Sequence, residues 1–597
     1  MPTYKAPLDD MRFVLHDVLD VAQLSALPGY EEATPDLIDA ILEEAGRFCA
    51  EVLQPLNQPG DAAGCTYEQG EVKAPPGFKE AYQQYCAGGW PALTADPKYG
   101  GQGMPHLMRS VVEEMMCASN LSFAMYPGLA HGAYHAMHTH GTEELKDKLL
   151  PKLVSGQWGG TMCLTEPHAG TDLGIITTKA VPAGDGAYRL TGTKIFISAG
   201  EHDLTENIIH LVLAKLPDAP GGTRGISMFM VPKFLPTDEG RPGTRNGVTC
   251  GSIEHKMGIK GNATCVLNFD NATGWMVGDA NKGMRAMFTM MNGARLGVGL
   301  QGLGLGEVAY QNAVAYARER LQGRSLTGAK NPGGPADPII EHPAVRQGLL
   351  RVKALNEGNR AFAYWIGMHI DLEHRHPDPA RRAESADLVA LMTPVIKAFL
   401  TDTGFESTNI ALQTFGGHGY VREYGMEQFV RDARIAPIYE GTNAVQAMDL
   451  VGRKLPEGMG RLLRRFFHPV SAEVEASRAD PALAEFVEPL AKAFERLQQA
   501  TQGVAMRSMA NPDEAGAAAE DYLHLLGYVT LGYMWLRMVK AARARLAAGA
   551  DDRAAFYEAK VATGRFYFAK VLPQVHALAA RIAAGATTVM SVPVDAF

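Results

Sequence analysis

The sequence predicts an α+β protein in which one β domain separates helical domains, and two observations support this class. At 597 residues the chain is too long for one core, since domains average about 150 residues. The hydrophobic period is helical in 1–160, strand-like in 161–281, and helical again in 282–455 and 456–597. We therefore expect an N-terminal helical domain, a middle β-barrel-like domain, a helical bundle domain and an extra C-terminal helical domain over these ranges.

The first helical range contains an apolar face and a cluster of histidines. Leu37, Ile38, Ile41 and Leu42 fall on one side of a helix. Three of the four histidines have helical spacing but no nearby acidic ligands in a typical motif, so we expect structural roles and predict no metal site. The histidines are His131, His135, His138 and His140.

Two segments of the β range could contact a ligand. Loop 162–172 combines small residues, hydroxyl groups and backbone donors that suit a polar cofactor. Segment 194–198 ends a strand with an aromatic ring and a hydroxyl group. Each pattern is also common in an ordinary turn or strand, so neither segment by itself identifies a site.

Two glycine-rich segments of the second helical range predict different roles. The glycines of 302–306 have neither a preceding strand nor a βαβ unit around them, so we expect close helix packing rather than dinucleotide binding. Segment 413–420 follows a helix as a glycine-rich turn whose amides could hold a pyrophosphate. It could equally cap the end of that helix.

The acidic residue Glu440 lies just before an apparent helix start. Thr442 or Asn443 can serve as the N-cap of that helix, and Gly441 allows close approach of a ligand. Apolar neighbours can remove water from a carboxylate, which raises its pKa towards that of a useful general base. An acid at this position is more often a dipole or capping partner, so local sequence leaves both interpretations open.

Composition excludes several classes of partner. The net charge of −9 and the absence of a dense Lys/Arg run argue against nucleic acid. Seven widely spaced cysteines without a CxxC pair indicate reduced thiols in a cytoplasmic protein. The acidic opening residues do not fit a signal peptide, and we expect no integral membrane segment.

Four motifs, in this order, resemble those of the acyl-CoA dehydrogenase family: TEPHAGTD, KIFIS, QTFGGHGY and RDARIAPIYEGTN. The resemblance covers about 36–455, and the full length is similar to long bacterial members that act on fatty acyl or methylmercaptopropionyl thioesters. It implies FAD as cofactor and α,β-dehydrogenation of acyl-CoA to trans-2-enoyl-CoA. Glu440 would remove the α-proton, the β-hydride would pass to flavin N5, and electron-transfer flavoprotein would accept the electrons.

The resemblance also assigns the flavin contacts. Arg320 and the turn at Gln413 match residues that reach FAD across a subunit boundary, so a homodimer is expected. The full set of matching cofactor residues is Leu164, Thr165, Gly170, Thr171, Phe196, Ser198, Arg320, Gln413, Gly416, Gly417 and Thr442.

Substrate contacts are implied at four positions: Thr171, Asn292, Arg295 and Gly441. Some relatives carry their glutamate immediately before the matching arginine, but Ala294 stands there, which leaves Glu440 as the candidate base. The sequence departs from the common pattern at several places: Phe196 for tryptophan, Asn292 for aspartate, Gln322-Gly323 for a hydroxyl and an aromatic residue, and Ala444 for glutamine.

Two other functions share much of this pattern. An acyl-CoA oxidase would use oxygen as acceptor, and a non-catalytic flavin-binding protein would not turn over. For the C-terminal range, we expect helices that either cover the dimer or replace the contacts of a second dimer. A membrane-surface role is less expected, because no basic amphipathic face stands out.

Overall fold

The computed structural model describes residues 2–549 and 551–597, which form two compact units. The bundle unit comprises the residues up to Gly46, Pro105–Ala118 and Val298–Phe597. The sheet unit comprises Arg47–Met104 and Ser119–Gly297. Apart from one hairpin at 66–73, the strands of the described residues lie between 158 and 277, with helices before and after them as expected, which confirms the α+β class. The units do not follow the four ranges expected from the sequence, whose boundaries stay a prediction.

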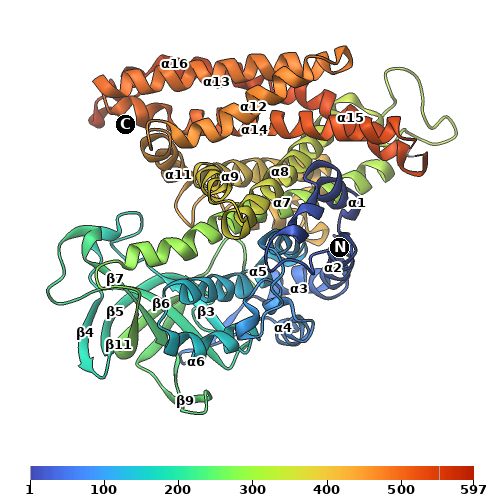
Figure 1. Ribbon diagram of the computed structural model, residues 1–597. Helices are drawn as coiled ribbons and strands as arrows, with labels where there is room; N and C mark the ends of the chain where they lie inside the picture. Colours follow the sequence, from blue (N-terminus) through green and yellow to red (C-terminus); the bar gives the residue numbers. More distant parts are fainter. Residues whose placement is uncertain (1, 550) are drawn as a thin grey trace. The chain divides into compact units, whose positions relative to one another are not determined.

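The sheet unit is built on seven strands (Figure 1). They follow the order β10-β11-β5-β4-β6-β3, and β7 pairs with both β11 and β6. These pairings close β11, β5, β4, β6 and β7 into a ring, with β3 parallel to β6 beside it. The strands are β3 (Trp158–Cys163), β4 (Lys179–Gly184), β5 (Ala187–Ser198), β6 (Asn207–Lys215), β7 (Ile226–Pro232), β10 (Val248–Ile253) and β11 (Thr264–Val277).

Two apolar cores explain why β6 is apolar on both faces. One core includes residues from every strand of the ring, among them Leu190, Val212 and Phe229. The other packs β6 and β7 against helices α5 (His106–His140), α6 (Glu143–Val154) and α7 (Gly283–Glu319). A strand covered on both sides reads as a continuous hydrophobic run rather than an alternating one. The unit also contains α3 (Gln54–Ala63), α4 (Phe78–Ala87) and the hairpins β1–β2 (Thr66–Glu68, Glu71–Lys73) and β8–β9 (Phe234–Pro236, Pro242–Arg245).

In the bundle unit, α7 packs closely against its neighbours through small residues. A methyl group added at Gly302 would come within 2.4 Å of the Leu400 carbonyl oxygen on α9 (Pro379–Thr414). At Gly306 it would meet Asn356 of α8 (Pro343–Arg375) at 2.8 Å. The glycines of 302–306 therefore serve helix packing, as the sequence predicts.

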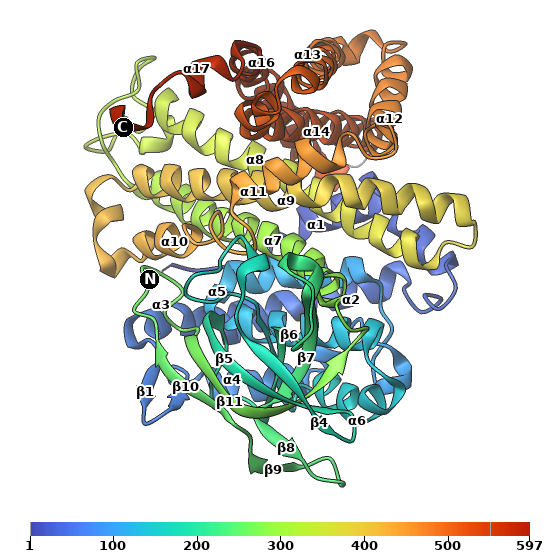
Figure 2. The same ribbon diagram turned by 90° about the vertical axis from the view of Figure 1, so that its left-hand side faces the viewer.

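The C-terminal helices pack together around α14, which both views draw among α12, α13 and α16 (Figure 1, Figure 2). Helix α14 is buried along most of its length. A methyl group at Gly358 of α8 would come within 3.0 Å of both Leu531 and Trp535, so α14 also docks on the bundle. The remaining helices are α1 (Leu8–Arg12), α2 (Pro35–Phe48), α10 (Met426–Ala433), α11 (Asn443–Asp449), α12 (Arg461–Ser477), α13 (Ala484–Ala510), α14 (Asp513–Ala547), α15 (Ala554–Phe566), α16 (Gln574–Ala584) and α17 (Thr587–Met590).

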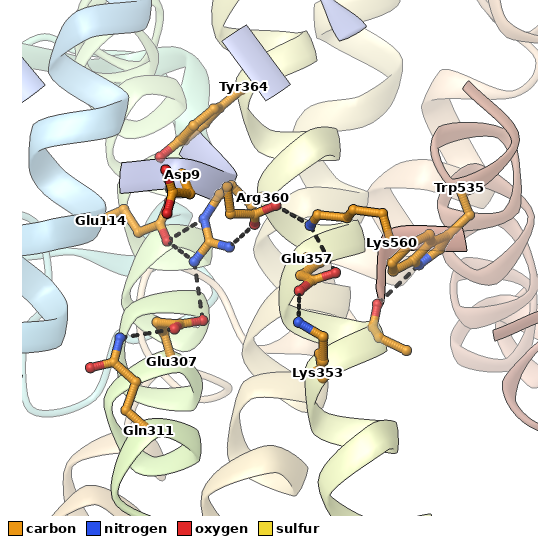
Figure 3. A network of polar contacts seen from close by, with 12 residues as sticks. Asp9, Glu114, Glu307, Gln311, Lys353, Glu357, Arg360, Tyr364, Trp535 and Lys560 are labelled. Carbon is orange, nitrogen blue, oxygen red and sulfur yellow. Dashed lines mark hydrogen bonds and ion pairs between the residues drawn. The ribbon is translucent and has the colours of Figure 1, made fainter. Parts of the chain in front are cut away.

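A buried network of charges joins distant parts of the bundle unit (Figure 3). Arg360 of α8 is 1% exposed and donates to Glu114 of α5 at 2.9 Å, to Glu307 of α7 at 3.1 Å, and to Asp10 near the N-terminus. Lys560 of α15 pairs with the same Asp10 and with Glu357 at 2.8 Å. The N-terminal residues and the C-terminal helices are thus linked through one set of buried ion pairs.

One helix of the described residues, α9, is long and apolar enough to cross a bilayer. Its most apolar window is 72% buried within the fold, as is usual for a core helix.

Candidate active site

The segment around Glu440 has an unusual backbone. Glu440 has a φ of +57° and Gly441 a φ of +84°, so two successive residues occupy the left-handed region. For a residue with a side chain this region costs about 1–2 kcal/mol, which the surrounding contacts must offset. Strain of this kind is concentrated at functional sites.

Helix α11 begins immediately after this segment. Thr442 is its N-cap, because the hydroxyl oxygen accepts a hydrogen bond from the Val445 amide at 3.3 Å. The capping function therefore belongs to Thr442, and Asn443 is the first residue of the helix. Glu440 lies outside the cap and is partly buried.

Gln446 holds the strained residues in place. Its side-chain amide donates to the carbonyl oxygens of Glu440 at 3.1 Å and Gly441 at 3.3 Å. Gln446 is fully buried, and a methyl group added at Gly441 would come within 2.5 Å of its Nε2 atom. Glycine is required here both for its φ and for this contact. The Asn443 amide also donates to the Pro437 carbonyl at 3.0 Å and closes the turn.

Tyr439 anchors the other side of Glu440. Its hydroxyl donates to the side-chain oxygen of Gln301 on α7. Burial and the neighbouring Glu440 carboxylate raise the pKa of this hydroxyl well above its ordinary value. The phenol therefore stays protonated and keeps its donor role.

The glycine turn after α9 lies beside the end of α7. Nothing lies within 4 Å of a methyl group added at Gly416 or Gly417, and both residues are exposed together with Gln413. The Tyr316 hydroxyl forms a hydrogen bond with Nδ1 of His418 in this turn at 2.8 Å. The Tyr316 ring also stacks on Phe415, with ring centroids 4.1 Å apart.

The exposed Arg320 follows Tyr316 by one helical turn, and its amide donates to the Tyr316 carbonyl at 2.9 Å. The structure therefore brings Arg320 and the glycine turn to one region of the bundle unit.

In the sheet unit, the loop after β3 is fixed to β5 by an ion pair. Lys194 donates to the Glu166 carboxylate and to the Leu164 carbonyl, both at 2.9 Å. Burial would raise the pKa of Glu166, but Lys194, Thr178 and the Thr177 amide outweigh burial and lower it to about 2. The main chain adds a bond from the Ile195 amide to the Thr165 carbonyl at 2.9 Å.

Phe196 follows this anchored stretch and exposes a large apolar side chain on the surface. The residue is 60% exposed, and its backbone has a φ of +58°. A large exposed apolar ring on a strained backbone is typical of a surface that a bound group covers. Ser198 ends β5 and is partly buried, while Gly170 and Thr171 are exposed on the loop.

The expected substrate residues are divided between the units. Asn292 and Arg295 lie on α7 within the sheet unit, as Thr171 does in its loop, and Gly441 belongs to the bundle unit. Asn292 is exposed, whereas Arg295 is only 6% exposed and its guanidinium carbon lies 5.9 Å from the centre of the Phe288 ring.

Sequence reasoning missed three residues that hold the site. Glu166 and Lys194 stand within the quoted motifs, and a lysine on the same strand face as Leu190 could have indicated a buried ion pair. Gln446 gives no such signal, because a glutamine in the first turn of a helix is usually exposed.

Comparison with known proteins identifies the family of the chain. Models of the acyl-CoA dehydrogenase N-terminal, middle and C-terminal domains match residues 36–157, 161–272 and 281–455, and an acetyl-CoA dehydrogenase C-terminal-like model matches 466–593. The chain is 42% identical to 3-methylmercaptopropionyl-CoA dehydrogenase of Ruegeria pomeroyi, over 97% of this chain and 98% of that protein. It is 36% identical to a butyryl-CoA dehydrogenase of Syntrophomonas wolfei, over 100% and 99% of the two chains.

The fold also has solved counterparts. A Bacillus anthracis acyl-CoA dehydrogenase complexed with FAD has a TM-score of 0.74 at 20% identity, covering 94% of this chain and 90% of that one. This confirms the fold, extra C-terminal domain included. The chain belongs to the acyl-CoA dehydrogenase family of FAD-dependent oxidoreductases.

Proposed function

We propose that this chain dehydrogenates acyl-CoA thioesters at the α and β carbons, with Glu440 as the general base. The observation that carries the proposal is the left-handed backbone of Glu440 and Gly441, each of whose carbonyl oxygens accepts a hydrogen bond from Gln446. A carboxylate that only capped a helix would not require this conformation, and Thr442 already provides the cap.

The proposed base takes the α-proton of the thioester onto its carboxylate. This proton is too weakly acidic for a free carboxylate, so the enolate charge developing on the thioester oxygen must be stabilised by hydrogen bonds. The Glu440 backbone amide is the donor that this chain can supply. FAD, when bound, supplies the acceptor that takes the β-hydride and a ribityl hydroxyl as second donor.

The chain's own residues fit a flavin in two places. In the sheet unit, Phe196 offers an exposed ring, and Thr165 and Thr171 offer polar groups on a loop fixed by Lys194. In the bundle unit, Gly416 and Gly417 leave space for a phosphate group beside the segment that carries Arg320. We propose that this second set serves the cofactor of a partner copy, which makes the protein a homodimer.

The proposed substrate is an acyl-CoA. In the bundle unit, Glu440 and Gly441 are the proposed contacts of its thioester, and in the sheet unit Thr171, Asn292 and Arg295 are proposed substrate contacts. The names of the two relatives support a short or thioether-bearing acyl group. Electron-transfer flavoprotein is the proposed acceptor, and the cytoplasm the proposed location.

Anaerobic mixing with a panel of acyl-CoAs tests the proposal. Short straight-chain, thioether-bearing and longer thioesters should bleach the bound flavin at different rates, and the fastest defines the acyl class. Bleaching by none of them would reject the proposed function and favour a flavin-binding protein without turnover. Rapid recovery of colour in oxygen, with formation of peroxide, would favour an oxidase instead.

A further inference from the structure

A single carboxylate connects the C-terminal helices to the helix that follows Glu440. His524 of α14 places its Nε2 atom 3.0 Å from Oδ2 of Asp402 on α9. The other oxygen, Oδ1 of Asp402, accepts a hydrogen bond from the Asn443 side chain at 2.7 Å. Asp402 thus bridges α14 and the first residue of α11.

The Asn443 side chain is held in one orientation. Its oxygen accepts from the fully buried Lys397 at 2.8 Å, while its nitrogen donates to Thr401 at 3.0 Å and to Asp402. An amide is the group that can accept at one end and donate at the other. The same residue closes the Glu440 turn through its backbone bond to Pro437 at 3.0 Å.

Helix α14 packs tightly against α9 at this same stretch. A methyl group added at Gly527 would come within 2.3 Å of the Phe399 ring. The Phe399 ring lies 5.7 Å from the ring of His524 and 4.9 Å from that of Tyr528, measured between centroids. Phe399 lies in sequence between the α9 residues that bind Asn443. The packing of α14 against Phe399 therefore supports the α9 turn that holds Asn443.

We infer that the C-terminal helical region helps to position Glu440, with His524, Asp402 and Asn443 as positioning residues. The inference rests on the proposed role of Glu440. Its physical basis is the left-handed backbone of Glu440, which is unfavourable by itself and persists only where surrounding bonds determine it. Loss of the His524 contact frees Asp402 to turn away from Asn443 and loosens one end of the turn.

If His524 only held α14 on the bundle, losing any α14–bundle hydrogen bond would have the same effect on the rate. A matched control variant separates this structural role from the positioning role. Trp535 of α14 donates to the Ala354 carbonyl on α8 at 3.0 Å, so Trp535→Phe also removes one hydrogen bond between α14 and the bundle. It does so away from Asp402. His524→Leu removes the bond to Asp402, whereas His524→Gln keeps a side-chain donor.

The experiment measures anaerobic flavin reduction by the fastest acyl-CoA of the panel, at saturating and at limiting concentration. Because small misplacements of reacting groups slow catalysis strongly, we expect His524→Leu to reduce the saturated rate about 10-fold with substrate affinity within about 2-fold of wild type. His524→Gln should recover most of the rate, and Trp535→Phe should keep it. An α-deuterated substrate should show a larger isotope effect in His524→Leu than in wild type.

Asp402→Asn provides a second test if His524→Leu does not fold with FAD bound. It should slow reduction in the same way, and the double variant His524→Gln/Asp402→Asn should be no slower than Asp402→Asn alone, because both act through one carboxylate. Rates in His524→Leu and Asp402→Asn no lower than in Trp535→Phe would overturn the inference. If no acyl-CoA bleached the flavin of the wild-type protein, the proposed function would be rejected, and the inference with it.

Discussion

The side-chain amide of Gln446 lies 3.1 Å from the carbonyl oxygen of Glu440 and donates a hydrogen bond to it. The contact links residues six positions apart and holds the peptide unit between Glu440 and Gly441. This unit follows directly on the Glu440 amide that we propose to polarise the thioester. The geometry of the base therefore depends on a residue that does not itself react.

Replacing Gln446 with methionine should separate positioning from binding. Methionine has a similar length but no donor, so the carbonyl groups of Glu440 and Gly441 lose their partner. We expect flavin reduction at saturating acyl-CoA to slow about 10- to 100-fold, with FAD content retained. Asn359→Leu is the matched control. It removes the buried hydrogen bond that the Asn359 side-chain amide donates to the Thr403 hydroxyl of α9 at 3.0 Å. An equal loss of rate in both variants would contradict the positioning role.

Gly441→Ala should disrupt the same turn from the other side. The new methyl group would meet Gln446 Nε2 at 2.5 Å, on a backbone with a φ of +84°. We expect at least a roughly 10-fold slower reduction of the flavin. Gly452→Ala serves as control, since nothing lies within 4 Å of a methyl group there. Normal rates in Gly441→Ala would show that the turn tolerates rearrangement.

Lys194→Met should weaken the sheet unit and its flavin loop. The substitution leaves the Glu166 carboxylate buried without its cation, which typically costs about 3–5 kcal/mol. Thermal unfolding should occur at lower temperature, and less FAD should remain after purification. Replacing the exposed Lys179 of β4 with methionine should change neither measurement.

The depressed pKa of Glu166 predicts a specific acid response. A carboxyl group whose folded pKa is about 2, against an ordinary value of 4.5, contributes stability above pH 4.5. That contribution decreases as the pH falls below 4.5 towards 2. Glu166→Gln should therefore flatten the stability-pH curve in this window relative to wild type. The exposed Glu68→Gln variant should keep the wild-type slope.

Arg360→Met should destabilise the bundle unit strongly. It leaves Glu114, Glu307 and Asp10 without the arginine that they share in a buried network. We expect the free energy of unfolding to fall by about 3–5 kcal/mol. Arg381→Met removes an ion pair to Glu384 whose arginine is 60% exposed, so we expect a change below about 1 kcal/mol. Equal urea midpoints for the two variants would contradict this account of the network.

The sequence predicted the elements better than the contacts between them. The change of hydrophobic period located the strands around Leu190 and Val212, and the missing βαβ unit correctly separated Gly302 from a nucleotide loop. Contacts such as Asp402 with His524 depend on which helix faces meet, and residues 122 positions apart carry no local signal of their pairing. The choice between Thr442 and Asn443 as cap likewise required the backbone geometry.

The role of Glu440 is tested most directly by Glu440→Gln, assayed anaerobically with the fastest acyl-CoA of the panel. Glutamine keeps the size and hydrogen-bonding capacity of the side chain but cannot accept the α-proton. We expect the variant to bind FAD and acyl-CoA with wild-type spectra and to lose flavin bleaching by at least roughly 1,000-fold. Bleaching at the wild-type rate would contradict the assignment of Glu440 as the base.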